Sequence, residues 1–265
     1  MAVNNTASKK KDKQSKNKKK PNKALVKFLS KIMLVVVLVV IAVIAVIFSG
    51  IFNITEILVE GNSNISAEQI ISFSGVKKGT NMFAITQKDI KSNLKKNSYI
   101  DDVEVKRVFP NKIKLIVDER KIEYCLQLAN SYVYINSQGF VLEISNLKPD
   151  VPMILGITTD LSNIKPNDRL INADLEKMNT VIKIMKTAKA NELESLITKI
   201  DTSDKNNYTI YLEVENKIAY LGNGEELNTR FLYIKSILKE QQGKKGEIFV
   251  NVDLNQEYVY FRENI

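Results

Sequence analysis

Residues 32–48 read IMLVVVLVVIAVIAVIF, an unbroken apolar run without a charged or polar side chain. With its neighbours on either side, this run is long enough for a helix that crosses a bilayer, which takes about 20 residues. Residues 1–31 before it hold eleven lysines and a single acid, Asp12. Because cytoplasmic flanks carry the excess of lysine and arginine, this imbalance predicts a cytoplasmic N-terminus. The pattern therefore predicts one membrane helix, residues 24–51, with the rest of the chain on the extracytoplasmic side.

The net charge of +9 belongs to the beginning of the chain. The residues after position 31 carry 28 basic and 29 acidic side chains, so they are almost neutral as a group. Residues 1–22 are predicted to be a disordered basic cytoplasmic tail, because a segment of lysine, asparagine and serine cannot bury a core. Such a tail can act as a topology signal, attract anionic lipid headgroups or contact nucleic acid. Nucleic-acid binding is the least favoured of these, since no aromatic residues are interleaved for base stacking.

A cleaved signal peptide is the alternative interpretation of the apolar run. Signal peptides have a shorter apolar region, about 7–15 residues, and end in a small-x-small cleavage site. Cleavage after Ser49 or Gly50 would place Ile47 or Phe48 where a small residue is needed. An uncleaved membrane anchor is therefore favoured.

The chain contains no histidine, no tryptophan and one cysteine, Cys125. Without histidine, Ser-His-Asp and Cys-His nucleophiles and histidine-based zinc sites are excluded. Cys125 has no partner for a disulfide within the chain, and it is expected to be a strand residue rather than a reactive thiol. We expect no cofactor, no metal and no small-molecule substrate.

Residues 52–120 are predicted to form a compact β-α-α-β-β unit. After a first strand, Ser66 with Gln69 three residues later gives a capping-box sequence that starts one helix. Thr86 is expected to cap a second helix. Two stretches that alternate apolar and polar residues then predict a hairpin, with Pro110 in its turn.

Residues 121–265 are predicted to form a C-terminal β domain with helices packed on its sheet. Apolar spacings of three and four predict two one-faced helices, one with Met178 and Ile182 on its apolar face and one with Phe231. These side chains are expected in the core rather than in a cofactor pocket. The candidate strands are residues 122–128, 132–135, 140–144, 208–214, 217–221, 248–252 and 258–261.

A set of positions in the first unit forms a recognisable motif: Val59, Gly61, Asn62, Val105, Arg107, Pro110, Glu119 and Arg120. Together with the order of basic tail, single span and two extracytoplasmic units, they resemble the bacterial cell-division family FtsQ, called DivIB in Gram-positive organisms. The resemblance covers residues 32–265 and is most specific in 54–120. It implies an α+β fold: a single N-terminal transmembrane helix, a POTRA-like β-α-α-β-β domain, then a β-rich domain. Arg107 and Glu119 are expected across the hairpin from each other, as an ion pair or as two solvated charges.

The resemblance implies a non-enzymatic scaffold in the cell membrane at the division septum. Such a scaffold would take part in septum formation by binding other single-span division proteins, of the FtsB/DivIC and FtsL type. Binding is expected by strand addition, in which a partner's strand completes an exposed sheet edge. An internal position of the last strand, with its aromatic residues in the core, is the alternative. The residues expected at the edge are Tyr258, Val259, Tyr260, Phe261 and Arg262.

The competing hypothesis is a membrane-anchored cell-wall hydrolase or transglycosylase that uses two carboxylates. Adjacent acids occur at residues 101–102 and 118–119, but neighbours on a strand point to opposite faces and do not converge. Glu192 and Glu194 are expected near a helix end, in solvent. The carboxylates therefore favour the scaffold over the enzyme.

Overall fold

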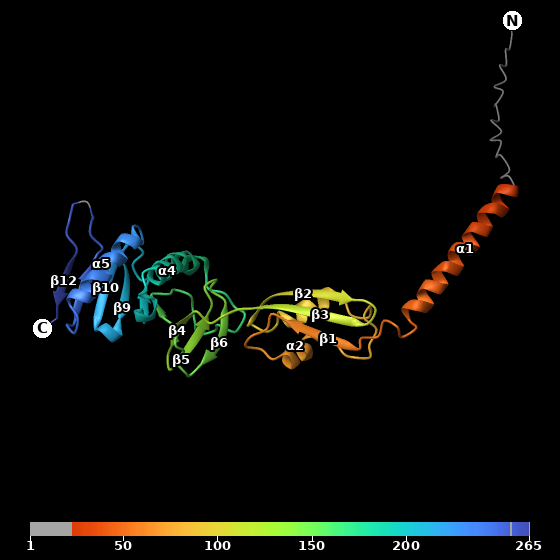
Figure 1. The fold of residues 1–265 in the computed structure, drawn as a ribbon, viewed down its shortest axis with the longest axis horizontal. Coiled ribbons are helices and arrows are strands. Elements are labelled where there is room, and N and C mark those ends of the chain that lie inside the picture. The colour runs from red at the N-terminus through yellow and green to blue at the C-terminus, as the bar shows by residue number, and fades with distance from the viewer. Residues whose placement is uncertain (1–22, 255, 265) are drawn as a thin grey trace, which may run out of the picture. The chain divides into compact units, whose positions relative to one another are not determined.

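The computed structural model describes residues 23–254 and 256–264, so the predicted basic tail, residues 1–22, lies outside the described residues. The chain divides into two compact units, Met1–Phe52 and Asn53–Ile265. Figure 1 shows the described helix of the first unit in red to dark orange, and the strands of the second unit from orange to blue.

Helix α1 spans Lys23–Ile47 and is long and apolar enough to cross a membrane. At about 1.5 Å per residue it measures about 37 Å, which exceeds the roughly 30 Å of a hydrocarbon core. No residue of α1 is buried by other parts of the described chain. The helix ends earlier than position 51, the predicted limit, because Phe48 lies in a turn and Gly50 adopts a φ of 81°.

The second unit begins with a small sheet in the strand order β1-β3-β2. Strand β1 (Glu56–Glu60) runs parallel to β3 (Lys112–Glu119), and β3 runs antiparallel to β2 (Ile100–Val108). Helix α2 (Ala67–Ser74) contacts β1, and helix α3 (Gln87–Leu94) contacts β2. The small sheet therefore has the predicted β-α-α-β-β order.

Local sequence explains where these helices begin. The Ser66 side chain accepts the backbone N–H of Gln69, and the Gln69 side chain accepts the N–H of Ser66, which confirms the predicted capping box. The Thr86 side chain accepts the N–H of Asp89 at the start of α3. The hairpin turn lies at residues 109–111 and contains a cis peptide bond before Pro110.

The remaining strands form one large sheet over the described residues, in the order β12-β11-β10-β9-β8-β7-β4-β5-β6. Two of these strands end the sheet, β6 at one edge and β12 at the other. The strands are β4 (Tyr124–Leu128), β5 (Ser131–Ile135), β6 (Val141–Ser145), β7 (Met153–Leu155), β8 (Lys199–Asp201), β9 (Tyr208–Leu212), β10 (Lys217–Gly222), β11 (Gly246–Phe249) and β12 (Tyr260–Glu263).

Helices α4 (Asn172–Ala190) and α5 (Leu227–Glu240) cover one face of the large sheet, and their apolar side chains share one core with the strands. Met178 and Phe231 are fully buried in it, as predicted. Ile182 was expected on the same face of α4 but is exposed, and the neighbouring Val181 takes the core position. The α+β fold class is therefore confirmed.

Several predicted strand limits were wrong, and β7 and β8 were missed. Strand β9 ends at Leu212 because a short 3₁₀ turn, Glu213–Glu215, follows it. The last strand begins at Tyr260 rather than at 258, because pairing with β11 starts only there. Strands β7 and β8 are three residues each and pair in parallel, so neither leaves an alternating pattern in the sequence.

Candidate functional site

Strand β12 forms an edge of the large sheet and pairs antiparallel with β11. The Asn264 N–H donates to the Lys245 carbonyl at 3.0 Å, which shows that the backbone groups of position 264 face β11. Antiparallel strands alternate such positions, so the backbone groups of Phe261 and Glu263 face the open side. On β11, the N–H groups of Gly246 and Val250 point the other way, to β10, in agreement with this alternation.

The inward side chains of this segment anchor it to the core. Val259 and Phe261 are half-buried and pack against the main core of the large sheet. Gly246 allows this close approach, because a Cβ there would overlap the carbonyl oxygen of Arg262 and the ring of Phe261. The fully buried Lys217 lies beneath, where its Nζ donates to the carbonyl of Lys244 at 2.8 Å and faces the Phe261 ring at 6.0 Å.

The outward face of the same edge carries a ladder of three aromatic rings. Tyr220 stacks on Phe249 with ring centroids 4.9 Å apart, and Phe249 stacks on Tyr260 at 4.6 Å. The rings come from β10, β11 and β12 at directly paired positions. Tyr260 ends the ladder and is 50 % exposed, so a further strand beside β12 could extend the stack.

Charged groups hold the ladder in place. Arg262 forms an ion pair with Glu247, and its guanidinium lies 4.9 Å from the Phe249 ring centroid. The Tyr220 hydroxyl donates to Glu247 at 3.0 Å. Burial raises the pKa of the Tyr220 hydroxyl, and its bond to the Glu247 carboxylate raises it further. The phenol therefore stays protonated and acts as a donor at neutral pH.

Two shallow grooves flank the edge strand. One, of about 370 Å³, lies between β12 and the end of α5 and is lined by residues that include Ile237, Tyr260 and Phe261. The other, of about 290 Å³, is lined by residues that include Tyr233 and Tyr258. Tyr258 was predicted as a strand residue but precedes β12, and it is 93 % exposed. Of the five predicted residues, Tyr260, Phe261 and Arg262 lie on the strand.

Sequence reasoning missed the residues that support this edge from β10 and β11, namely Lys217, Tyr220, Glu247 and Phe249. Each aromatic of the ladder occupies the outward-facing position of its strand, which is a weak signal. Their stacking depends on which strands are neighbours, and this pairing joins positions that are distant along the chain.

The motif position Glu119 closes a loop. Its carboxylate accepts hydrogen bonds from the N–H groups of Ser63, Asn64 and Ile65 and from the Ser63 hydroxyl. Burial alone would raise the pKa of Glu119, but these donors outweigh it and hold the pKa below its usual range. Gly61 begins this loop, because a Cβ there would overlap the carbonyl oxygen of Val117.

Arg107 does not lie across the hairpin from Glu119, so that prediction was wrong. The strand register pairs Arg107 with Ile113 near the turn and Glu119 with Ile100 at the opposite end. The Arg107 guanidinium instead donates to the Ile85 carbonyl at 3.0 Å and lies over the Phe83 ring. Residues of opposite charge that flank a hairpin face each other only where the register places them.

The other motif positions make contacts that support the fold. Val59 pairs with Leu115 in the small sheet, Val105 is buried, and Asn62 donates to the Ile65 carbonyl. Arg120 follows β3. Its side chain forms an ion pair with Asp101, donates to the Ser98 carbonyl and lies 4.1 Å from the Phe140 ring centroid.

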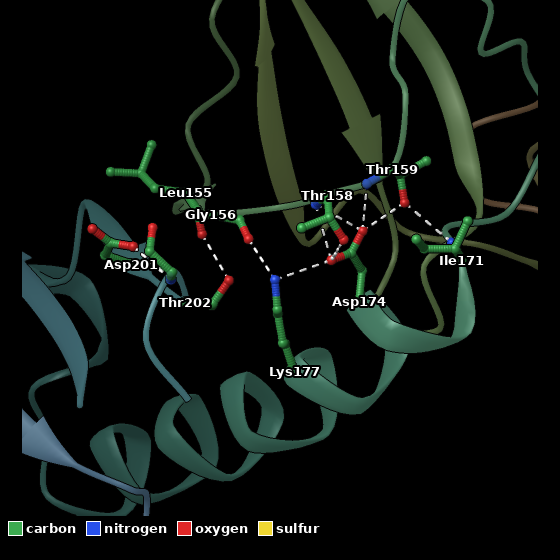
Figure 2. A network of polar contacts seen from close by, with 10 residues as sticks. Leu155, Gly156, Thr158, Thr159, Ile171, Asp174, Lys177, Asp201 and Thr202 are labelled. Carbon is green, nitrogen blue, oxygen red and sulfur yellow. Dashed lines mark hydrogen bonds and ion pairs between the residues drawn. The ribbon is translucent and has the colours of Figure 1, made fainter. Parts of the chain in front are cut away.

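A buried carboxylate at the start of α4 organises the loop before that helix (Figure 2). Asp174 is fully buried and accepts hydrogen bonds from the backbone N–H and hydroxyl groups of Thr158 and Thr159. Lys177 adds an ion pair at 3.2 Å and donates to the Gly156 carbonyl. Burial raises the pKa of Asp174, but the donors reverse this and keep the pKa below its usual range. An ionised and fully ligated carboxylate suits a structural role better than proton transfer.

The acids weighed for an enzyme lie apart. Asp102 forms an ion pair with Lys95, while Asp101 does so with Arg120. Glu192 pairs with Lys235, and its pKa is lowered by that contact. Among the described residues, no cluster of three or more histidine, cysteine or acidic side chains is arranged to hold a metal.

Comparison with known proteins gives the class of the domain formed by the small sheet and its two helices. Residues 52–120 match the family described as POTRA domain, FtsQ-type. The small sheet with its two helices is therefore an FtsQ-type POTRA domain.

Comparison of the whole chain with known proteins identifies its relatives. It is 28 % identical over 211 residues to the cell division protein DivIB of Clostridium acetobutylicum, which covers 78 % of this chain and 82 % of the relative. It is 26 % identical over 222 residues to DivIB of Clostridium tetani, with 79 % of each covered. It is 31 % identical over 132 residues to the cell division protein FtsQ of Rickettsia bellii, with 49 % of this chain and 48 % of the relative covered. These relatives, to which the chain is similar, are named as the cell division proteins DivIB and FtsQ.

Proposed function

We propose that this protein is a bitopic scaffold of the division machinery that binds other single-span division proteins by strand addition at β12. The observation that carries the proposal is the open edge of β12 in a chain whose relatives are cell-division proteins. Partners of the FtsB/DivIC and FtsL type are the candidates that the family implies. The protein would act at the septum of the cell membrane, without catalysis.

The proposed topology follows from the ends of α1. The lysine-rich segment before it places the N-terminus in the cytoplasm by the positive-inside rule. The POTRA domain and the large sheet would then lie outside, where the extracytoplasmic parts of division proteins can reach β12. Protease added to intact spheroplasts should remove the POTRA domain and the large sheet but spare a fluorescent fusion at the N-terminus. Protection of the large sheet would contradict this topology.

Strand addition predicts which backbone groups of β12 bind the partner. A partner strand would bond to the backbone groups of Phe261 and Glu263, and its side chain opposite Tyr260 would extend the aromatic ladder. The partner residue at that position should be aromatic or large and apolar, since aromatic cross-strand pairs contribute about 0.2–1 kcal/mol each. Tyr260 and the grooves beside it supply the area of a binding hot spot.

The test compares prolines at adjacent positions. Glu263→Pro removes an N–H from the open side, whereas Asn264→Pro removes the N–H that donates to Lys245. In the full-length protein in nanodiscs, Glu263→Pro should weaken binding of the purified DivIC-type partner at least about tenfold, equivalent to roughly 1.4 kcal/mol. It should leave the unfolding temperature nearly unchanged.

The controls separate backbone from side chain. Glu263→Ala keeps the N–H and should bind as the unchanged protein does, whereas Asn264→Pro should loosen β12 itself and lower thermal stability. Tyr260→Ala should also weaken binding by loss of the ladder's last ring, and Phe261→Lys should do so by displacing an anchor of the strand. Equal affinity for Glu263→Pro, Tyr260→Ala and the unchanged protein would rule out strand addition at this edge.

A further inference from the structure

The tip of the POTRA domain where the chain enters this domain carries exposed apolar side chains. Phe109 in the hairpin turn is 61 % exposed, and Phe83 in the loop before α3 is 41 % exposed. Their ring centroids are 6.1 Å apart, and the Arg107 guanidinium lies 5.4 Å from that of Phe83. Val108 beside Phe109 is exposed as well. Two loops that are distant in sequence thus present one apolar tip.

The backbone holds both loops against the first residues of this unit. Ile54 donates to the Thr80 carbonyl at 2.9 Å and accepts the N–H of Gly79 at 2.7 Å. Thr55 donates to the Asn111 carbonyl at 2.9 Å, two residues after Phe109. The aromatic tip is therefore fixed where the chain enters the POTRA domain.

The chain itself limits how far this tip can be from a bilayer that α1 spans. Only residues 48–52 separate the end of α1 from Asn53, and fully extended they allow at most about 20 Å. Three of these five residues are apolar, Phe48, Ile51 and Phe52, so the linker itself favours the membrane interface over full extension. This limit follows from chain length and holds for either orientation of the helix.

The charges near the tip match a lipid surface. The segments at residues 77–85 and 106–112 contain five basic residues and no acid, and two of the five, Lys106 and Lys112, form ion pairs with Glu104 and Glu56. Lys77 and Lys78 are both exposed, at the start of the loop that carries Phe83. Aromatic side chains flanked by lysine and arginine are typical of surfaces that enter the interface of anionic membranes.

We propose that this tip docks on the same membrane that α1 spans, with Phe83 and Phe109 inserted at the headgroup–acyl boundary and Lys77 and Lys78 on anionic headgroups. Docking would restrict the swing of the POTRA domain about its short linker. It would thereby hold the large sheet and β12 within a limited range of heights and directions. The inference rests on the anchoring role proposed for α1, but not on partner binding.

Because the chain contains no tryptophan, tryptophan fluorescence can test this proposal without background signal from the protein. Phe109→Trp and Phe83→Trp each introduce a sole tryptophan reporter into the full-length protein. We would reconstitute these variants in vesicles of phosphatidylglycerol and phosphatidylcholine with brominated acyl chains, which quench tryptophan on contact. Phe73→Trp is the matched control, because Phe73 is 45 % exposed but lines a groove with Tyr99 and Glu143, toward the large sheet.

Leu38→Trp, within α1, reports on the anchor. We expect strong quenching at position 38, and quenching at positions 83 and 109 at least about twofold greater than at position 73. Quenching at position 38 with equal, weak quenching at 73, 83 and 109 would overturn the docking proposal and leave the anchor intact. Weak quenching at position 38 would overturn both.

Two further results bear on what the tip contacts. The double substitution Lys77→Gln and Lys78→Gln, in the Phe109→Trp background, should reduce quenching in anionic vesicles. No reduction would overturn the headgroup contacts. A tip that is shielded from iodide only when a purified division protein is added, and not by lipid alone, would overturn membrane docking in favour of a protein contact.

Discussion

The large sheet ends in two strands of similar length, β6 and β12, whose outer sides differ. On β6, the Val141 N–H donates to the Asp168 carbonyl at 2.8 Å, and the Val141 carbonyl accepts the N–H of Asn167 at 2.9 Å. The Leu142 carbonyl accepts the Ser98 hydroxyl at 2.6 Å. A loop of the β domain and a residue of the POTRA domain therefore close the first part of this edge, at Val141 and Leu142.

The outer side of β12 carries no such cover within residues 23–254 and 256–264. An unpaired edge is a template for another strand, and proteins usually blunt it with short strands and charges. β12 is short and carries Arg262 and Glu263, which discourages indiscriminate pairing, yet its aromatic ladder ends in an exposed ring. The comparison teaches that an edge closed by the chain's own groups contributes to stability, whereas an open edge is available for binding.

The largest effect on stability should come from disrupting the contacts that hold the loop beside β6. Asp174→Ala removes the acceptor that holds Thr158 and Thr159 and leaves Lys177 without its buried partner (Figure 2). We expect a loss of about 3 kcal/mol in the free energy of unfolding, measured by urea denaturation of the full-length protein in detergent. Exposure of β6 should also promote self-association.

The control for that experiment lies in the same loop. Asp160 is exposed, and its carboxylate accepts hydrogen bonds from its neighbours Ser162 and Asn163. Asp160→Ala should change the free energy of unfolding by less than about 0.5 kcal/mol. Equal losses for the two substitutions would show that the buried network does not support the closed edge.

A smaller effect should appear as a dependence of folding stability on pH. The pKa values of Asp174 and Glu119 lie below their usual range in the folded protein, so protonation favours the unfolded state. Their stabilisation is complete above the unfolded pKa values, about 4, and is lost as pH falls through the lower folded values. Thermal unfolding between pH 7 and about 2.5 should show this loss.

Asp174→Asn provides the comparison, because it cannot titrate. It should be less stable than the unchanged protein at neutral pH, and its stability should fall less on acidification. Parallel pH curves for the two proteins would contradict the role assigned to the ionised Asp174 carboxylate.

A third, still smaller effect concerns the POTRA contribution to the closed edge. Ser98→Ala leaves the buried Leu142 carbonyl without the hydroxyl donor and should cost about 1–2 kcal/mol in urea denaturation. Ser92 on α3 is exposed, and Ser92→Ala should be nearly neutral. A neutral Ser98→Ala would mean that β6 is closed by the β-domain loop alone.

The smallest effect on stability is expected at the open edge. Tyr260→Ala removes a half-exposed ring that ends the ladder and should cost less than about 1 kcal/mol in the free energy of unfolding. Its effect on partner binding should be larger than its effect on folding. A loss of several kcal/mol in folding would instead make Tyr260 a structural residue and weaken the contrast between the edges.

The strongest sequence predictions were those that depend on short-range chemistry. The apolar run, the Ser66–Gln69 capping box and the hairpin turn at Pro110 each depend on neighbours within a few residues, and all three are present. The failures involve long-range pairing. β7 and β8 were missed because each is short and parallel, and Arg107 was paired with Glu119 without knowledge of the register.

The candidate site divides in the same way. The residues of the last strand were identified by their aromatic content and by the family resemblance. The residues that support this strand, such as Lys217 and Phe249, could not be identified from the sequence. They come from strands about 10 to 40 residues away, and no local pattern encodes the order of those strands in the sheet.

The sequence by itself determined the long apolar helix, the order of the POTRA elements and the two amphipathic helices, because apolar periodicity and capping act within a few residues. Only the tertiary structure decided which strand lies at an edge, which edge is closed and which backbone groups remain open. Those properties depend on pairing between distant segments, which the burial of a shared core selects and no single segment specifies.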